Sequence, residues 1–345
     1  MHCAKALRFL AAVLAAAAAS AHAGMGMMEL PGNAVSGPVT VVYPTQAASG
    51  TVRRGPFQLE VAVDAAPTAG RSHLVVISHG SPGSPWVHFD LARSLVEAGF
   101  TVALPEHHAD NYKDASDPGP PAWRRRPVEV SRAIDRMAQE QAFAANLDLT
   151  RVGMFGMSAG GHTALTLAGG RWSPSRLRDH CRLNLAEDFH ACAGPSVSLT
   201  GGPLDGAKKQ IVSAIIERKW DDPAWYEHVD GRIVAVAAGV PFAADFDADS
   251  LRQPKVALLI ISARKDRWLN PQFHSDAIVA ACRTCEPPLT MESGGHGALL
   301  GPLPPGGDLS ELIQDPPGFD RGTEVPRINA AITRYFVGAL PSPVP

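Results

Sequence analysis

Short apolar runs that alternate with amphipathic helical stretches limit the fold of this sequence more than any other feature. Residues 73–78, 233–238 and 256–261 are almost continuously apolar, as expected for strands that are buried on both faces. Buried strands separated by helices form a mostly parallel sheet that is covered by helices on both sides. We therefore expect an α/β fold.

The remaining expected elements cover most of the chain after residue 23, and no linker divides it. Residues 24–345 are therefore predicted to form one domain. Residues 171–230 interrupt the alternation, with one amphipathic stretch at 208–219, so we expect an insertion that packs over the carboxyl ends of the strands. Further strands are expected at 38–43, 57–63, 101–104, 151–155 and 289–292, helices at 86–98, 128–147, 159–168, 272–282 and 325–340, and a loop up to residue 126.

The composition is typical of a globular protein. The chain has 345 residues, of which 45% are hydrophobic and 19% are charged, so it can bury a sizeable core. Lys and Arg number 31 and Asp and Glu number 34, which gives a net charge of −3, and no long basic stretch occurs. This charge balance argues against nucleic acid as a partner.

The first 23 residues have the pattern of a secretory signal peptide. Lys5 and Arg8 precede an apolar run over residues 9–21, and Ala21-His22-Ala23 has the form of a cleavage site. The run is shorter than the ~20 residues that a membrane span needs. No cysteine follows it that could carry a lipid. We expect an exported protein, periplasmic or secreted, without a stable membrane anchor; a buried N-terminal helix is the alternative.

Four of the five cysteines remain after removal of the predicted signal, which contains Cys3. An even number in an exported chain favours two disulfides, and the local pairings Cys181 with Cys192 and Cys282 with Cys285 are predicted. The C-x-x-C spacing of the second pair leaves redox or zinc chemistry open as an alternative, although no second ligand pair lies at zinc-finger spacing.

The segment that carries chemistry is Gly156-Met157-Ser158-Ala159-Gly160, which joins a predicted strand to a predicted helix. A G-x-S-x-G pattern in this context is typical of a nucleophile elbow, where the serine occupies a tight, strained turn that only glycine permits two positions on either side. The following helix directs its N-terminus at the developing oxyanion, with the Ala159 N–H as one donor. The sequence predicts Ser158 as a nucleophile.

A nucleophilic serine needs a base, and the base needs an acid to orient it, in the chain order Ser, acid, His for this kind of fold. Asp266 follows the apolar strand at 256–261, and His296 lies in a glycine-rich loop after the last short strand. We predict Asp266 as the acid and His296 as the base.

The second oxyanion donor is expected in the loop after the strand at 73–78, which reads His79-Gly80-Ser81-Pro82. Gly80 permits close backbone approach, and Pro82 has no N–H, so the Ser81 N–H is the candidate. His79 precedes the serine in the chain and is interpreted as a brace for this loop rather than as the base.

Several other polar and aromatic residues are given structural interpretations. His107, His108 and Asp110 are interpreted as a polar rim beside the pocket, because two adjacent histidines do not easily chelate one ion, and no metal is expected. Residues 124–126 are interpreted as a solvated patch of arginines, and His162 as a side chain that packs locally. Four aromatic residues have two possible interpretations, as the lining of an apolar pocket or as core packing: Trp86, Trp220, Trp225 and Tyr226.

At these motifs the chain resembles the α/β-hydrolase superfamily, and within it the dienelactone hydrolase-like branch that includes bacterial relatives of platelet-activating-factor acetylhydrolase. The resemblance covers nearly all of the chain after residue 23 and implies a cofactor-free serine hydrolase. The chain departs from the branch in having Met157 where a histidine is common and Ser158 where dienelactone hydrolases have cysteine. In the acetylhydrolases the acid follows an earlier strand, whose counterpart at 234–239 has no carboxylate here. This departure favours Asp266, with Asp245 or Asp247 as alternatives. The resemblance rests on Val39-Thr-Val-Val-Tyr43-Pro44, Ser78-His79-Gly80-Ser81, Gly156 to Gly161, Asp266 and Gly294-Gly295-His296.

The predicted function is therefore hydrolysis of carboxylic esters of small or lipid-like molecules through an acyl-enzyme. An amidase or peptidase that uses the same three residues is the first alternative. A binding protein that retains the fold without catalysis is the second, and the intact order of serine, acid and histidine argues against it.

Overall fold

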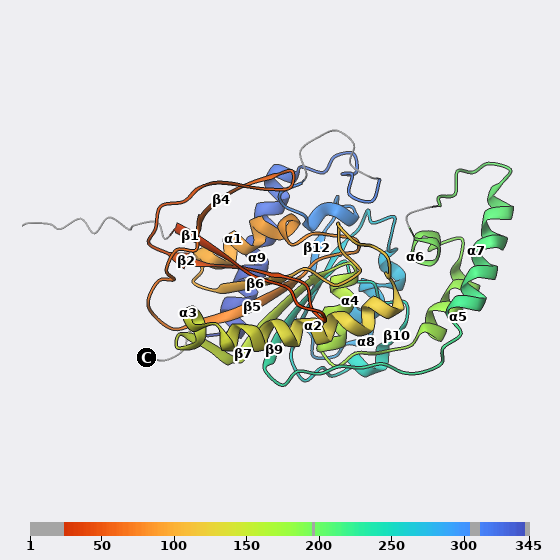
Figure 1. Cartoon of the computed structure of the whole chain (residues 1–345). Coiled ribbons are helices and arrows are strands. Elements are labelled where there is room, and N and C mark those ends of the chain that lie inside the picture. The colour runs from red at the N-terminus through yellow and green to blue at the C-terminus, as the bar shows by residue number, and fades with distance from the viewer. Residues whose placement is uncertain (1–23, 195–196, 304–310, 342–345) are drawn as a thin grey trace, which may run out of the picture.

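The computed structural model describes residues 24–194, 197–303 and 311–341, so the predicted signal peptide lies outside the described residues. The expected α/β architecture is confirmed: a large, mostly parallel sheet is covered by helices on both faces (Figure 1). The strand order is β12-β11-β9-β7-β5-β6-β2-β1-β4-β3. The first six strands in this order are parallel, and β2 is antiparallel to its neighbours β6 and β1.

The strands of the sheet are β1 (Gly24–Leu30), β2 (Val39–Thr45), β3 (Gly50–Arg54), β4 (Phe57–Val63), β5 (Ser72–Ser78), β6 (Thr101–Pro105), β7 (Leu147–Met157), β9 (Ile233–Gly239), β11 (Ala257–Ala263) and β12 (Leu289–Met291). A separate pair is formed by β8 (Arg171–Trp172) and β10 (Phe246–Asp247).

The α-helices are α1 (Phe89–Glu97), α2 (Pro120–Gln139), α3 (Gln141–Ala144), α4 (Ala159–Leu167), α5 (Pro174–Asn184), α6 (Phe189–Ala193), α7 (Asp205–Lys219), α8 (Ser275–Ala281) and α9 (Arg321–Ala339). Short 3₁₀ helices are η1 (Pro85–His88), η2 (Ala248–Leu251), η3 (Pro271–Phe273) and η4 (His296–Leu299).

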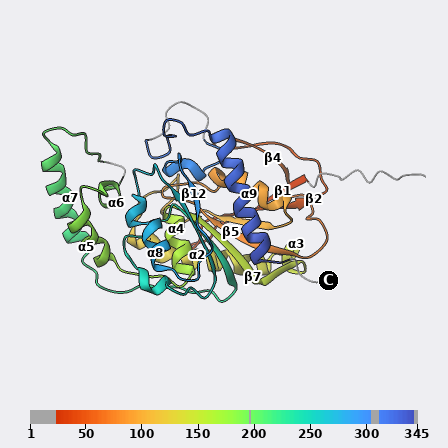
Figure 2. The ribbon, with the colours of Figure 1, turned by 180° about the vertical axis from the view of Figure 1, so that it is seen from behind.

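The sheet separates two hydrophobic cores, because successive residues of each strand point to opposite faces. In β5, Leu74 and Val76 belong to the core under α2 and α4, whereas Val75 and Ile77 belong to the core under α1 and α9. Figure 1 shows α2 in front of the sheet, and the reverse view in Figure 2 shows α9 in front. The central parallel strands are therefore buried on both sides, as their continuous apolar runs predict.

One predicted helix is wrong at both of its ends. The sequence predicts a loop up to residue 126 and a helix over 128–147, but α2 begins at Pro120 and ends at Gln139. Two prolines at the first positions start the helix, where their missing N–H groups need no partner. Glu140 is extended and ends it, and β7 already begins at Leu147. The predicted helix over 272–282 is likewise divided into η3 and α8.

Strands β1 and β3 are absent from the prediction. β1 pairs antiparallel with β2, and its Gly-Met-Gly-Met-Met sequence has none of the β-branched residues that mark a strand. β3 lies at the edge of the sheet and exposes most of its side chains, so it has no apolar alternation to detect.

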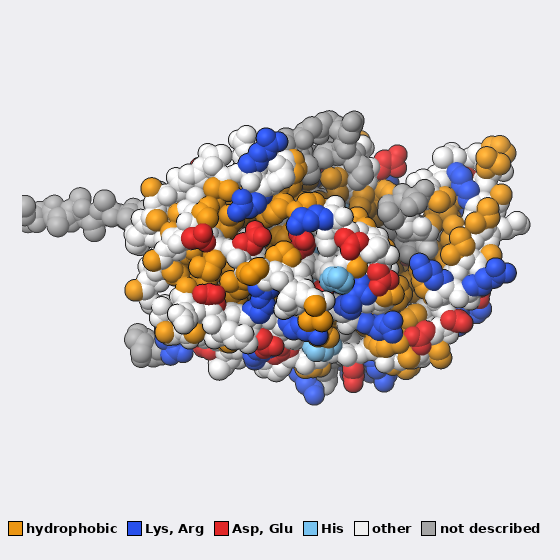
Figure 3. Space-filling model, in the orientation of Figure 1, with side chains coloured by type: hydrophobic (Ala, Val, Ile, Leu, Met, Phe, Trp, Pro, Cys, Tyr) orange, Lys and Arg blue, Asp and Glu red, His pale blue; other side chains and the backbone are white. Residues whose placement is uncertain are grey.

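Residues 171–230 contain α5, α6 and α7, where the sequence predicts only one helix. The predicted disulfide between Cys181 and Cys192 is present and joins α5 to α6, and the Cys282–Cys285 disulfide is present as well. α5 and α7 form an arm that extends away from the sheet (Figures 1 and 2). Hydrophobic side chains are visible along this arm at the right of Figure 3, and Leu183, Leu204, Ile211 and Ile215 are exposed on it.

Candidate active site

Ser158 occupies the sharp turn between β7 and α4. Its backbone has φ 58° and ψ −118°, which residues with side chains rarely adopt. A Cβ on Gly156 would lie 1.9 Å from the carbonyl oxygen of Gly160, and one on Gly160 would lie 2.0 Å from that of Ser78. The turn therefore requires glycine at both positions, for the reason that the sequence pattern indicates.

The structure brings Ser158, His296 and Asp266 together from distant parts of the chain. Nε2 of His296 lies 3.0 Å from Oγ of Ser158, and Nδ1 of His296 lies 2.7 Å from Oδ2 of Asp266. Asp266 follows β11, and His296 begins η4 after the neighbouring strand β12. The His296 and Asp266 side chains are buried, and Ser158 is half-buried.

The second oxygen of the Asp266 carboxylate is held by the backbone. Oδ1 accepts hydrogen bonds from the N–H groups of Trp268 at 2.8 Å and Leu269 at 2.9 Å. These bonds leave Oδ2 for His296. With its proton on Nδ1, the imidazole donates to Asp266, and its Nε2 is free to accept the proton of the Ser158 hydroxyl.

The two alternative carboxylates are engaged elsewhere. Asp245 is buried and lies 3.0 Å from Nε2 of His162, and Asp247 pairs with Arg171 at 2.7 Å. The His162 ring stacks on Trp123 with 4.7 Å between ring centroids, in agreement with its interpretation as a locally packed side chain.

Ala159 and the loop that carries Ser81 border Ser158. Ala159 is the first residue of α4, so its N–H has no acceptor within the helix. A Cβ built on Gly80 would lie 3.4 Å from Cβ of Ser158, which shows that the loop carrying Ser81 passes directly beside the serine.

His79 is part of the packing behind this loop. Its Nδ1 lies 2.7 Å from the carbonyl oxygen of Gly80, and its Nε2 accepts a hydrogen bond from the N–H of His107 at 3.2 Å. Burial lowers the pKa of His79 well below its usual range, and the neighbouring His107 and Arg126 lower it further. A neutral ring that donates through Nδ1 and accepts through Nε2 satisfies both contacts.

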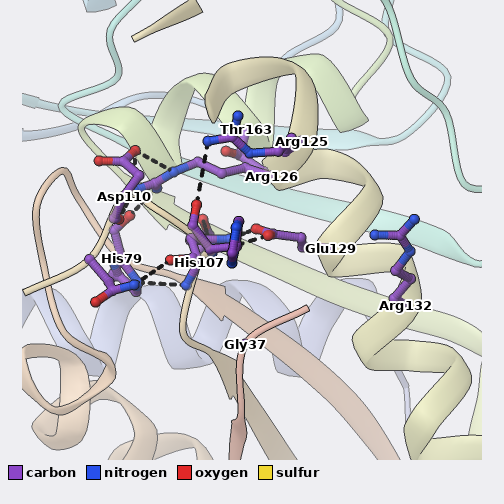
Figure 4. Close-up of polar contacts among 12 residues, drawn as sticks. Gly37, His79, His107, Asp110, Arg125, Arg126, Glu129, Arg132 and Thr163 are labelled. Atoms are coloured by element: carbon purple, nitrogen blue, oxygen red, sulfur yellow. Dashed lines mark hydrogen bonds and ion pairs between the residues drawn. The ribbon is translucent and has the colours of Figure 1, made fainter. Parts of the chain in front are cut away.

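The interpretation of residues 124–126 as a solvated patch is wrong for Arg126. Its side chain is 1% exposed and forms an ion pair with the buried Asp110. The interpretation of His107 and Asp110 as a polar rim is also wrong, because both are completely buried. Figure 4 shows them in one cluster with Arg126. The sequence contains one sign of this cluster, the mostly polar segment from His107 to Asp110 after a buried strand. It gives no sign of which residues these side chains contact.

A second chain of hydrogen bonds in this cluster has the residue types of a serine–histidine–acid triad. Oγ of Ser78 lies 2.7 Å from Nε2 of His107, and Nδ1 of His107 lies 2.6 Å from Oε2 of Glu129. All three side chains are buried, and burial lowers the pKa of His107, with the Arg126 charge adding to the effect. Because Ser78 is completely buried, we interpret this set as structural: it joins the end of β5, the loop after β6 and α2.

The four aromatic residues considered for a pocket have different environments. Trp86 is buried in the core beside Phe57, and its ring also contacts that of the exposed Tyr112. Trp225 is exposed, and the Arg171 and Arg176 guanidinium groups lie over its ring. Trp220 is half-buried, and Tyr226 packs on Trp172.

Residues 24–194, 197–303 and 311–341 lack two further features. No group of three or more His, Cys, Asp or Glu side chains there is arranged to hold a metal ion. No helix in those ranges is long and apolar enough to cross a membrane.

Comparison of the sequence with models of known protein families and with curated proteins gave no match in either case.

Proposed function

We propose that this protein is a serine hydrolase that cleaves carboxylic esters through an acyl-enzyme, on an α/β-hydrolase fold of the dienelactone hydrolase-like branch. One observation carries the proposal: Ser158, at a strained strand-to-helix turn, is hydrogen-bonded to His296, which is hydrogen-bonded to Asp266. A nucleophile, a base and an orienting acid in contact at the carboxyl ends of parallel strands support acyl transfer.

In acylation, the Ser158 hydroxyl gives its proton to Nε2 of His296 as Oγ forms a bond to the ester carbonyl carbon. Asp266 stabilises the imidazolium that results and keeps its Nδ1 proton. The tetrahedral intermediate then collapses, the bond to the alcohol oxygen breaks, and His296 returns the proton to that oxygen. The alcohol departs and leaves an ester of Ser158.

Deacylation repeats these steps with water. His296 takes a proton from the water as the water oxygen attacks the acyl carbon. The bond between that carbon and Oγ of Ser158 then breaks, His296 returns the proton to Oγ, and the carboxylic acid departs. In both halves the negative oxygen is stabilised by the N–H groups of Ala159 and Ser81. The resemblance implies no cofactor, and these steps need none.

The expected substrate is a small-molecule or lipid-like ester, and the expected location is outside the cytoplasm. Two disulfides are compatible with an oxidising compartment. Gly24 pairs with Thr45 in the sheet, so cleavage after Ala23 would leave β1 intact. Fractionation of cells that express the full chain tests export, and full-length protein in the cytoplasm would contradict it.

Labelling of the purified protein with a fluorophosphonate probe, followed by peptide mapping, tests the nucleophile. We expect a single adduct on Ser158 and turnover of p-nitrophenyl esters, with the optimum in a chain-length series reporting the size of the acyl site. A matched p-nitroanilide series separates ester hydrolysis from amide hydrolysis.

Ser158→Ala should remove both labelling and turnover and leave the circular dichroism spectrum unchanged. Ser116→Ala, in an exposed loop, is the matched control and should behave as the wild type. Ester turnover by folded Ser158→Ala would refute the proposal, and a folded wild type with neither adduct nor turnover would favour a binding role.

A further inference from the structure

A buried arginine holds the loop that carries the candidate oxyanion donor Ser81. Arg126 lies in α2, which packs on β5 and β6. Its guanidinium donates to the carbonyl oxygens of His79 at 2.6 Å and Gly80 at 3.4 Å. It also donates to the Asp110 carboxylate from Nε at 2.9 Å, with Nη2 2.8 Å from the same oxygen (Figure 4).

The Gly80 carbonyl oxygen is held on the Arg126 side of the loop by three donors. Besides Arg126, it accepts hydrogen bonds from the N–H of Gly83 at 2.8 Å and from Nδ1 of His79 at 2.7 Å. In a planar trans peptide, the C=O of one residue and the N–H of the next point in opposite directions. The Ser81 N–H therefore points away from Arg126, in a loop whose Gly80 lies against Ser158.

The side chain of Ser81 is tied to the same ion pair. Its hydroxyl donates to Oδ1 of Asp110, and Oδ2 of that carboxylate faces Arg126. Arginine suits this position because its planar fork of N–H donors can bind a carboxylate and two carbonyl oxygens at once. The ammonium of lysine is a compact charge on a flexible stem and lacks this fork.

Stability alone does not account for such a pair. Removing two charges from water costs about as much as their attraction returns, so hydrophobic residues of similar volume often stabilise a core equally well. What the ion pair supplies here is a fixed direction for the backbone that borders Ser158.

We propose that Arg126, acting through Asp110 and the Gly80 carbonyl, is a positioning residue that keeps the Ser81 N–H directed at the oxyanion. This inference rests on the proposed ester hydrolysis at Ser158. Because an oxyanion donor strengthens its bond in the transition state, loosening it lowers kcat more than it changes KM.

The test compares Arg126→Lys with Arg125→Lys in the full chain, with active sites counted by the fluorophosphonate probe. Arg125 is the neighbour in the same helix, is partly exposed and pairs with Asp117. For Arg126→Lys we expect kcat per labelled site to fall about 10- to 100-fold, with KM within about threefold of the wild type. Binding of a trifluoromethyl ketone, whose adduct with serine carries an oxyanion, should weaken by about the same factor as kcat/KM. Arg125→Lys should match the wild type in all three measurements.

Because a lysine at a buried site can prevent folding, Ser81→Ala is measured in parallel. It removes the hydroxyl that bonds Asp110 and keeps the N–H, so we expect kcat to fall about 3- to 10-fold at unchanged KM. If Arg126→Lys folds and has the wild-type kcat per labelled site, the inference is overturned. If Arg126→Lys does not fold, a wild-type kcat in Ser81→Ala overturns it. A wild type that neither labels at Ser158 nor hydrolyses an ester would instead overturn the proposed function, before the variants are compared.

Discussion

Asp266 presents its two carboxylate oxygens to different partners. Oδ1 accepts hydrogen bonds from the N–H groups of Trp268 and Leu269, and Oδ2 faces Nδ1 of His296. An asparagine at this position must place its amide oxygen where two backbone N–H groups require an acceptor. Its NH₂ group then faces Nδ1, and the imidazole has to carry its proton on Nε2, where it cannot accept the serine proton.

Asp266→Asn is therefore expected to lower kcat by about 10⁴-fold, as the wrong imidazole tautomer does in serine proteases, with the fold unchanged. Hydrolysis of a p-nitrophenyl ester, with folding followed by circular dichroism, measures this effect. Asp247→Asn is the control, since that carboxylate pairs with Arg171 away from His296, and its kcat should stay within about twofold of the wild type. A large loss in the control instead would assign the acid to Asp247.

His88 is a titratable residue enclosed in the core. Both of its ring nitrogens are buried and form no hydrogen bond with any residue that the structure describes, and its ring lies 5.6 Å from that of Phe155. Burial lowers the pKa of His88 to about 4 from a usual value of 6.5. The unfolded chain therefore binds a proton at this residue more readily than the folded protein does.

This difference predicts that acid destabilises the fold at His88. Above pH 6.5, His88 is neutral in both states and protonation does not change the free energy of unfolding. As the pH falls from 6.5 to 4, only the unfolded chain binds the proton, and the free energy of unfolding falls by about 3 kcal/mol. Urea unfolding at a series of pH values should show a shallower decline for His88→Leu than for the wild type over this range. An identical pH dependence in the two proteins would contradict the prediction.

At the scale of elements, the junction of β7 with α4 depends on close backbone contact. The missing side chain of Gly160 lets α4 start against the carbonyl oxygen of Ser78 at the end of β5. A methyl group there would meet backbone on a buried strand, which cannot move aside as a flexible side chain can.

Gly160→Ala is expected to destabilise the protein by about 2 to 4 kcal/mol and to slow fluorophosphonate labelling of Ser158. Gly206→Ala in α7 is the matched control, since a Cβ at Gly206 would have no atom of the described residues within 4 Å. Alanine favours a helix over glycine, so the control should be neutral or up to about 1 kcal/mol more stable. Equal melting temperatures for the two variants would show that the close approach at Gly160 does not constrain the junction.

At the scale of the whole molecule, Asp188 joins residues 171–230 to the loop that follows Asp266. Its carboxylate accepts hydrogen bonds from Nε2 of His180 at 2.8 Å, Nε2 of His274 at 3.0 Å and the N–H of Asn270 at 3.2 Å. Burial raises the pKa of Asp188, but the bonds from the two histidines outweigh it and lower the pKa to about 2.

Because the folded pKa of Asp188 lies below its usual 3.8, this group stabilises the fold above pH 3.8 and loses that effect as the pH falls to 2. Asp188→Asn should lower the unfolding free energy at pH 7 by about 2 kcal/mol and flatten its decline between pH 4 and 2. Asp179→Asn, whose exposed carboxylate on α5 pairs with Arg178 and Arg182, is the control and should change stability by less than about 1 kcal/mol. Equal losses in both variants would argue against Asp188 as the joining residue.

The sequence alone was sufficient for features that depend on neighbouring residues. The apolar runs of β5, β9 and β11 predict a sheet buried on both faces, because a strand with both faces buried has apolar side chains at successive positions. The glycines around Ser158 predicted the tight turn, because steric limits on φ and ψ act within a few residues. The disulfide of Cys181 with Cys192 joins residues only 11 apart in the chain, so the local pairing was the natural prediction.

Only the tertiary structure decided which polar side chains meet across elements. Nothing near Arg126 in the sequence indicates that Asp110 and the backbone of His79 will surround it, and three consecutive arginines instead predict a solvated patch. Asp188 and His274 lie 86 residues apart and meet only because the fold brings the start of α6 to the start of α8. The energy of a buried polar group depends on its partners in space, and a sequence pattern records the type of a side chain but not the partners that the fold brings to it.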